Sequence, residues 1–134
     1  MTALLFLMLA TNPTFYKDVL PILQNHCQSC HRPGQIGPMP LLTYAQTQSK
    51  AAAIARMVSS RKMPPWFADS AIGHFANDPS LTAGEIETLE HWVSTGAAAG
   101  QRKDAPPPKQ WTEGWNISPP DTVVRMPKPV SIPA

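Results

Sequence analysis

The apolar residues near the start of the chain recur at a helical spacing. Four of them fall at i, i+4, i+7 and i+8, on one face of a helix: Phe15, Val19, Ile22 and Leu23. Asn12 and Pro13 are typical of a helix start, with Asn as the N-cap and Pro at the first helical position. Pro21 interrupts the pattern, so it either kinks this helix or opens a second one. In both cases the pattern predicts a helical segment that leads into Cys27.

Two capping boxes predict two further helices. A Thr-Tyr-Ala-Gln sequence opens a helix expected over 43–62, and Met-Pro-Pro-Trp at 63–66 ends it, because a residue before Pro avoids the helical region. Its apolar face comprises Ala51, Ile54, Met57 and Val58. The second box pairs Thr82 with Glu85, and Gly96 is placed to end that helix. Its apolar stripe comprises Ile86, Leu89 and Val93, with Trp92 beside it.

The remaining segments are predicted to be loops and a tail. Residues 32–42 and 67–80 contain Gly and Pro without apolar periodicity, which favours loops. The 134-residue chain has 16 Pro, and they are concentrated towards its C-terminus. Because each Pro lacks a backbone N–H, we expect residues 101–134 to form a Pro-rich tail or linker. The compact part is then a small all-α domain over 13–100, and a core of this size often needs a covalent or cofactor staple.

Charge and hydropathy narrow the class of protein. The net charge of +2 is too small to favour nucleic-acid binding. No apolar run approaches the ~18 residues of a membrane span. Residues 3–10 form a short apolar run like the central part of an export signal, with Ala10 at a candidate cleavage point but without basic residues before it. We therefore expect residues 1–12 to be a remnant of an export segment.

The chain has two cysteines, and they lie in one motif, Cys27-Gln28-Ser29-Cys30-His31. Two cysteines exclude a disulfide-rich scaffold and leave haem attachment, dithiol redox chemistry or metal binding. Cys-x-x-Cys-His is the haem attachment signature. Two thiols three positions apart can each add to one vinyl group on the same edge of a porphyrin. The His that follows is then held under the iron and supplies an imidazole nitrogen.

Two other chemistries use similar residues. A thioredoxin-type dithiol requires a strand before the motif, whereas this sequence predicts helices and loops. A structural zinc site requires four ligands, which Cys27, Cys30 and His31 could complete with one further His. The candidates for that fourth ligand are His26, His74 and His91.

The sixth ligand of a haem iron must come from elsewhere in the chain. The candidate side chains are Met39, Met57, Met63, His26, His74 and His91. Met63 is the best placed, because it lies at a helix end and two prolines fix the backbone after it. Met39, between two prolines, is the second choice and His74 the third. Met57 is expected to pack in the core, His26 to be solvated or bonded to backbone, and His91 to be exposed.

Three further residues are candidates for contacts around a haem. The second ring nitrogen of His31 should donate to a carbonyl, and Pro38 is the expected source of that carbonyl. Arg61 either interacts with the helix dipole or contacts haem propionates or an acidic partner. Trp66 either packs on the haem edge, donates a hydrogen bond to a propionate or is simply buried.

These residues together resemble a class I, c-type cytochrome. The entering helix, the haem motif, Gly37-Pro38, Met63 and the last helix come in that family's order. The resemblance implies a small helical domain wrapped around one haem. It also implies that Phe15 or Tyr16 meets Trp92 where the first and last helices cross. The Val-Leu-Pro-Ile-Leu before the motif and the Lys-Met-Pro-Pro-Trp after it are similar to cytochrome domains that precede copper-dependent, ascorbate-monooxygenase-like domains.

The resemblance implies electron transfer and not enzymatic catalysis. One covalent haem c would be held by Cys27, Cys30, His31 and Met63 in a periplasmic or otherwise exported protein. The partners would be redox proteins, a copper-containing oxidase or monooxygenase among them. The 134 residues contain no His-rich copper domain, so no monooxygenase activity is carried over. The alternatives are a haem sensor or peroxidase-like protein with an open sixth position, and a structural zinc-binding module.

Overall fold

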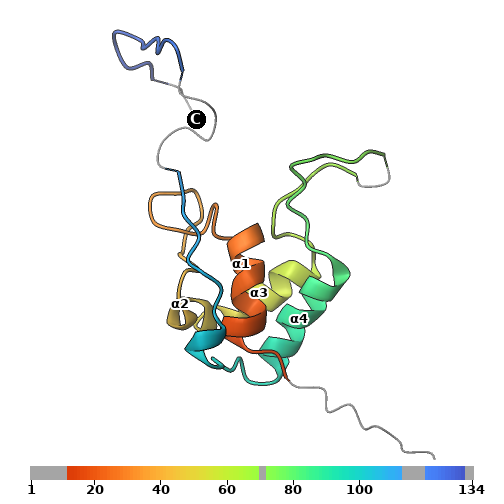
Figure 1. Cartoon of the computed structure of the whole chain (residues 1–134). Helices are drawn as coiled ribbons and strands as arrows, with labels where there is room; N and C mark the ends of the chain where they lie inside the picture. The colour runs from red at the N-terminus through yellow and green to blue at the C-terminus, as the bar shows by residue number, and fades with distance from the viewer. Residues whose placement is uncertain (1–11, 70–71, 113–119, 132–134) are drawn as a thin grey trace, which may run out of the picture.

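The structure is a computed structural model that describes residues 12–69, 72–112 and 120–131. Figure 1 shows four α-helices gathered into one body, α1 Leu20–His26, α2 Tyr44–Gln48, α3 Ala51–Ser59 and α4 Ala83–Ser94. A π-helical turn, η1 Phe15–Val19, precedes α1, and a 3-10 turn, η2 Arg102–Asp104, follows α4. No strand is present in the described part of the chain, as the all-α prediction requires. The predicted export segment lies outside the described residues, apart from Asn12.

The first helical segment begins differently from the prediction. Its N-cap is Thr14, not Asn12, and the backbone N–H of Thr14 donates to the Asp18 carboxylate at 2.7 Å. The helix then starts as the π turn η1 and becomes α-helical at Leu20. Pro21 lies in the first turn of α1, where a missing N–H costs no helical hydrogen bond. The second alternative for Pro21 is therefore the observed one.

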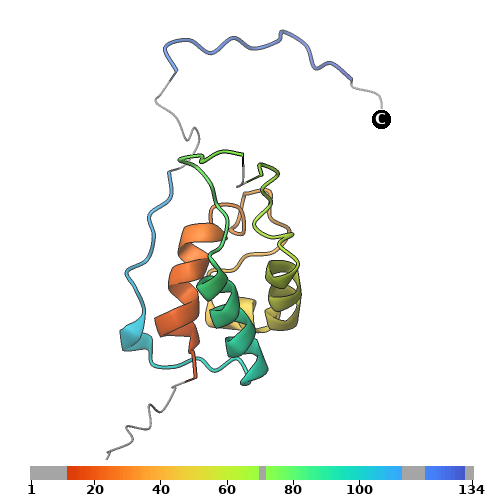
Figure 2. The same ribbon diagram turned by 90° about the vertical axis from the view of Figure 1, so that its right-hand side faces the viewer.

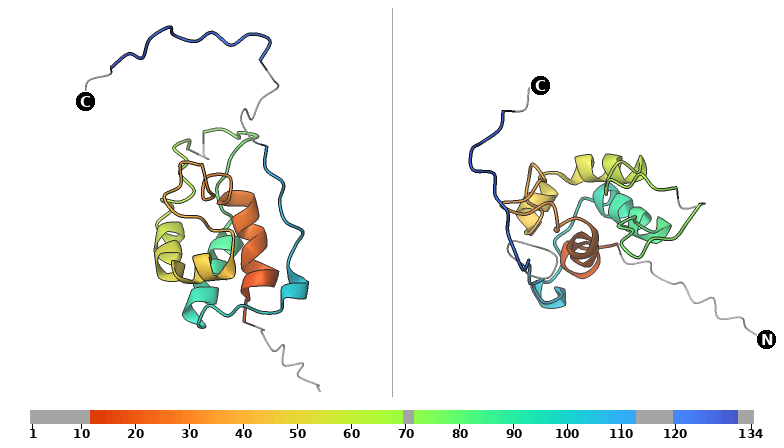
Figure 3. Two further views of the ribbon diagram at one scale, coloured as in Figure 1. Left: turned by 90° about the vertical axis from the view of Figure 1, so that its left-hand side faces the viewer. Right: turned by 90° about the horizontal axis from the view of Figure 1, so that it is seen from above.

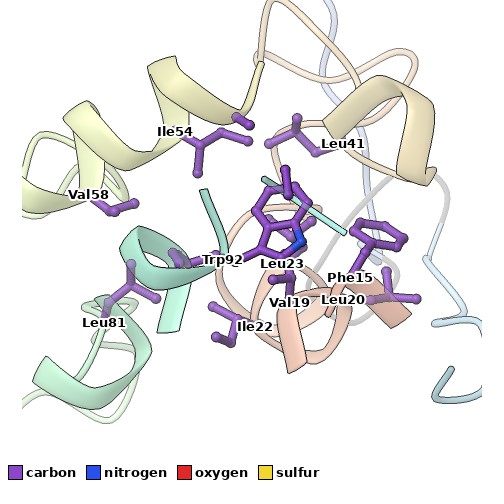
Figure 4. Close-up of a cluster of buried hydrophobic side chains, with 13 residues drawn as sticks. Phe15, Val19, Leu20, Ile22, Leu23, Leu41, Ile54, Val58, Leu81 and Trp92 are labelled. Atoms are coloured by element: carbon purple, nitrogen blue, oxygen red, sulfur yellow. The ribbon is translucent and has the colours of Figure 1, made fainter. Parts of the chain in front are cut away.

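The core forms where η1 and α1 meet α4 (Figure 4). Phe15 and Trp92 are both fully buried, and their ring centroids lie 6.3 Å apart. The expected contact between Phe15 and Trp92 is thus confirmed. Trp92 Nε1 donates to the carbonyl of Ala98 at 2.9 Å, so this buried polar atom is satisfied. Val19, Leu23 and Leu89 complete the fully buried apolar centre.

The single helix predicted over 43–62 is two helices. The capping box that opens α2 is present as predicted, but α2 ends at Gln48 and α3 begins at Ala51. Two polar side chains compete for the backbone carbonyls here, because Thr47 Oγ1 donates to the carbonyl of Thr43 and Ser49 Oγ donates to the carbonyl of Gln46. The chain turns between the two helices, and α3 then packs along α4 through Ile54 and Val58.

The last long helix matches its prediction closely. Both halves of the capping box of α4 are formed between Thr82 and Glu85. The helix ends at Ser94, and Gly96 takes a left-handed conformation with φ of 97°. Trp92, expected beside the apolar stripe, is buried, whereas Ile86 and Val93 are partly buried. No helix within the described residues is both long and apolar enough to cross a membrane.

Part of the predicted tail is packed against the helical body. After η2 the chain runs back alongside α1, as the side views in Figures 2 and 3 show. Gln24 Nε2 donates to the carbonyl of Pro107 at 3.1 Å, and Lys109 Nζ donates to the carbonyl of Gln24 at 3.0 Å. Trp111 lies under the guanidinium of Arg32, which is 4.9 Å from the ring centroid. Packing therefore continues beyond residue 100, where the compact part was expected to end.

Candidate functional site

The end of α1 and the loop after α3 form two walls of one cavity of about 130 Å³. One wall comprises His26, Cys27, Ser29, Cys30 and His31. The other comprises Met63, Pro64, Pro65 and Pro79. The structure therefore brings the Cys-x-x-Cys-His motif and Met63 to the same cavity, although more than thirty positions separate them in the sequence.

The motif lies on a turn that continues directly from α1. Cys27 is the C-cap residue of the helix. Its carbonyl accepts hydrogen bonds from the backbone N–H groups of Cys30 at 3.1 Å and His31 at 2.8 Å. These bonds keep both thiols and the imidazole on consecutive turns of one compact segment. Three chemically active side chains are thus held by the backbone and not by a long side-chain network.

The two cysteines have different surroundings. Both are free, but Cys27 is half-buried and Cys30 is exposed. The pKa of the Cys27 thiol is raised to about 12. Burial is the main cause, and the nearby charges of Cys30 and Glu85 act in the same direction. Cys27 is therefore a neutral thiol at physiological pH, whereas Cys30 faces solvent.

His31 has one ring nitrogen bound to the backbone. Its Nδ1 lies 3.0 Å from the carbonyl oxygen of Met39, which can only accept. Nδ1 therefore carries the hydrogen in the neutral ring, and Nε2 keeps its lone pair for a ligand. This tautomer is the one that a metal-binding imidazole needs.

The carbonyl that accepts from His31 is that of Met39, so the prediction that Pro38 supplies it is wrong. The backbone after the motif folds back on itself through two bonds, from Gly37 N to the carbonyl of Cys30 and from Leu41 N to the carbonyl of His31, each 2.9 Å long. Met39 lies midway between these two anchors, and its carbonyl oxygen is the one that meets the ring. Pro38 precedes this point and is exposed.

Gly37 is a site residue to which sequence reasoning gave no role of its own. A Cβ at this position would lie 2.6 Å from the carbonyl oxygen of Cys30 and 2.8 Å from His31 Nδ1. No side chain fits there without moving the haem-motif turn. The Gly-Pro dipeptide was the available signal, but its function belongs to the glycine and not to the proline.

Met63 lies at the boundary between two hollows. It is 40% exposed, and it follows α3 at a point where Arg61 takes a left-handed conformation with φ of 53°. The second hollow, of about 160 Å³, adjoins the first at Met63 and Pro64. Arg61 and Trp66 line this second hollow and not the cavity of the motif. Met63 therefore lines both hollows, and it is the predicted sixth ligand.

Trp66 carries an unsatisfied buried polar atom. Its Nε1 is inaccessible to solvent and has no hydrogen-bond partner among the residues that the structure describes. The ring makes an edge contact with Phe75, with centroids 5.7 Å apart. A buried N–H without an acceptor costs about 1–3 kcal/mol, so this position favours a bound group that carries an acceptor.

The other candidate ligands lie in different surroundings. Met39 packs its side chain against the hydrophobic core, and Met57 is half-buried on α3. His74 and His91 are exposed, as predicted for His91. His26 lines the cavity, but its Nδ1 lies 2.9 Å from the carbonyl of Pro79 and its Nε2 lies 3.0 Å from the Glu85 carboxylate. Its bond to backbone was expected, and its bond to Glu85 was missed.

These positions bear on the zinc-binding alternative. Both ring nitrogens of His26 are engaged, so this residue does not offer a free fourth ligand. Within the described ranges there is no group of three or more His, Cys, Asp and Glu side chains arranged to hold a metal ion.

Comparisons with protein-family models, curated proteins and solved structures found no match for this chain.

Proposed function

We propose that this protein is an electron carrier that resembles the class I c-type cytochromes and holds one covalent haem c. Cys27 and Cys30 attach the haem, and His31 and Met63 are its axial ligands. The observation that carries the proposal is the single cavity lined by the attachment motif on one side and by Met63 on the other.

Four features of the chain fit this group. The hydrogen bond from His31 Nδ1 to Met39 leaves Nε2 as the free ligand atom. Gly37 allows the backbone to approach that ring closely. The unpartnered Nε1 of Trp66 suits a propionate oxygen as its acceptor, which is one of the roles expected for this residue. Arg61 lines the same hollow as Trp66 and adds a positive charge for that propionate.

A haem with both axial positions filled changes its iron between two oxidation states by one electron, and Met/His ligation raises the reduction potential. The chain's own residues do the rest. His31 and Met63 exclude water and small molecules from the iron. The apolar walls formed by the prolines of the loop keep solvent away from the haem faces. The acid–base pair beside the cavity, His26 and Glu85, is engaged in hydrogen bonds within the chain, so we assign no catalytic residue.

The proposed location is the periplasm or another compartment outside the cytoplasm, because covalent haem attachment joins reduced thiols to exported haem. The proposed partners are redox proteins, including a copper-containing oxidase or monooxygenase, as the resemblance implies. Cell fractionation tests the location, since holoprotein found mainly in the cytosol would contradict it.

The direct test is covalent attachment. The chain is expressed together with a c-type maturation system and analysed by haem stain on a denaturing gel and by intact mass. We expect the haem to stay on the chain, with sharp α and β bands on reduction and a Met-to-iron charge-transfer band on oxidation. Haem that extracts into acidified butanone, or a colourless zinc-containing protein, would rule the proposal out. The double variant Cys27→Ala, Cys30→Ala is the matched control and should carry no covalent haem.

A further inference from the structure

The two walls of the cavity are joined by one side chain, that of His26. It comes from the last position of α1, next to Cys27. Its ring bridges to Pro79 at the end of the loop and to Glu85 in the first turn of α4. No other hydrogen bond connects the two walls among the residues that the structure describes. The loop that starts at Met63 is thus fixed at its far end by His26.

Both partners of His26 are acceptors. The carbonyl oxygen of Pro79 has no hydrogen to give, and neither does the carboxylate of Glu85 while it is ionised. Burial acts to raise the pKa of Glu85, but hydrogen bonds from Thr82 and the nearby His26 outweigh it and hold that pKa below its usual range. The other oxygen of Glu85 already accepts from Thr82 N and Thr82 Oγ1, at 2.8 Å each. Glu85 is therefore an acceptor on both oxygens.

A neutral imidazole carries one N–H and can satisfy only one of these two acceptors. The imidazolium carries two and satisfies both at the observed distances of 2.9 and 3.0 Å. The titratable groups around it are Glu85 on α4 and the Cys27 thiol on α1, which becomes a thioether once haem is attached. Asp78 of the loop is bound to the backbone N–H of Ser80.

We propose that His26 is a positioning residue which, as the imidazolium, ties the loop after Met63 and the start of α4 to the haem-attachment motif. Loss of its proton removes one of the two bonds and loosens the loop. The proposal deepens the proposed function, because it rests on that function for the role of the cavity. The bridge itself is a property of the chain.

The first experiment reads the protonation of His26 directly. Nitrogen-15 NMR of the imidazole rings in the purified protein is followed as pH is raised. We expect His26 to show two protonated nitrogens at neutral pH. A neutral, single-tautomer His26 at neutral pH would overturn the proposal. This readout does not depend on haem, so it stands even if the attachment test fails.

The second experiment reads the loop. Amide hydrogen exchange, corrected for intrinsic rates, is measured over residues 72–81 above and below the pH at which His26 titrates. We expect exchange to rise about tenfold when the charged bond is lost. Glu85→Gln should remove this pH dependence, since its amide can donate to a neutral ring. His26→Gln should give fast exchange at both pH values, whereas His91→Gln, at an exposed position of α4, should behave as wild type. Equal protection in His26→Gln and wild type would contradict the proposal.

Discussion

Trp92 and Trp66 lie in two regions of this molecule that differ in how well their side chains are packed and hydrogen-bonded. Trp92 is fully buried between η1 and α4, and its N–H has an acceptor at 2.9 Å. Trp66 lies in the loop after α3, and its N–H is buried without a partner in the described chain. Close to it in sequence, Phe67 is 99% exposed and Ile72 is 86% exposed. The first region is a well-packed core. The second region also contains large apolar side chains, but most of their surface is exposed.

The difference indicates where a large apolar group belongs. Exposed aromatic and aliphatic side chains on one segment signal a surface that is covered in the working protein. The helical half supplies the acceptor for the Trp92 N–H and buries the apolar side chains of its core. In the loop half, the proposed haem would supply an apolar surface, and its propionates would supply an acceptor for the Trp66 N–H.

The largest expected effect is on the stability of the core around Trp92. Trp92→Ala removes the centre of the packing between η1 and α4, and we expect a loss of about 3–5 kcal/mol in the free energy of unfolding. Trp66→Phe keeps most of the ring and removes only the N–H. If bound haem supplies the acceptor, the loss in the holoprotein is about 0.5–1.5 kcal/mol. Urea unfolding followed by circular dichroism measures both. Equal losses would show that the two regions are not built differently.

The next effect concerns the ligand in the loop half. Met63→Ala should open the sixth position, allow carbon monoxide to bind and lower the reduction potential. Met39→Ala is the matched control, because Met39 contributes its carbonyl to His31 and its side chain to the core. It should change neither property. Optical spectra and a redox titration give the answer, and an unchanged low-spin spectrum in Met63→Ala would transfer the assignment to another residue.

A smaller effect is expected where the motif meets its supporting loop. Gly37→Ala places a methyl group 2.6 Å from the carbonyl oxygen of Cys30, and we expect a loss of about 1–3 kcal/mol. Gly84→Ala is the control, because nothing lies within 4 Å of its added Cβ and α4 gains a better helix former. It should stabilise the protein by about 0.5–1 kcal/mol. Thermal unfolding compares the two variants, and a loss in both would contradict the geometry.

The thiol of Cys27 predicts a pH dependence in the haem-free chain. Its pKa is raised by burial from 9.0 to about 12, so the folded state binds the proton more tightly than the unfolded state does. The resulting stability is fully present below the ordinary pKa and is lost as pH rises towards 12. Urea midpoints measured across that range should fall. They should not fall for this reason in Cys27→Ala, whereas Cys30→Ala should keep the dependence.

The smallest expected effect is in the segment that lies along α1. Trp111→Ala removes the contact with Arg32 and should cost about 0.5–1 kcal/mol, without changing the haem spectrum. Val124→Ala is a control in an exposed part of the tail. A change in the low-spin spectrum of Trp111→Ala would show that this segment also holds the haem motif in place.

The features predicted correctly from the residue pattern are local ones, whereas the confirmed contact between Phe15 and Trp92 was expected from the family resemblance. The capping boxes at Thr43 and Thr82 depend on residues three positions apart, and both are formed. The split between α2 and α3 was missed, because a capping box marks where a helix begins and not where it ends. The prediction that Pro38 accepts from His31 was wrong, because the conformation of the turn after the motif brings the carbonyl of Met39 to the imidazole ring.

The features that the residue pattern missed join distant residues. His26 and Glu85 are 59 positions apart, and no motif around either residue predicts their contact. Arg32 and Trp111 meet only because the chain returns along α1. Met63 was chosen by its position at a helix end, and its approach to the motif depends on how α3 packs against α4.

Two backbone hydrogen bonds between η1 and the segment after α4 bear on when the two thiols are accessible. Phe15 N donates to Ala98, and Tyr16 N donates to Ala99, at 2.9 and 3.1 Å. The segment that covers η1 is therefore synthesised long after the motif, and contacts between such distant residues form late. Until then both thiols remain open to a modifying enzyme, whereas Cys27 is half-buried in the folded chain. If haem is attached as proposed, attachment should be fastest on the exported chain before it folds, while the backbone of residues 98 and 99 is not yet bonded to η1.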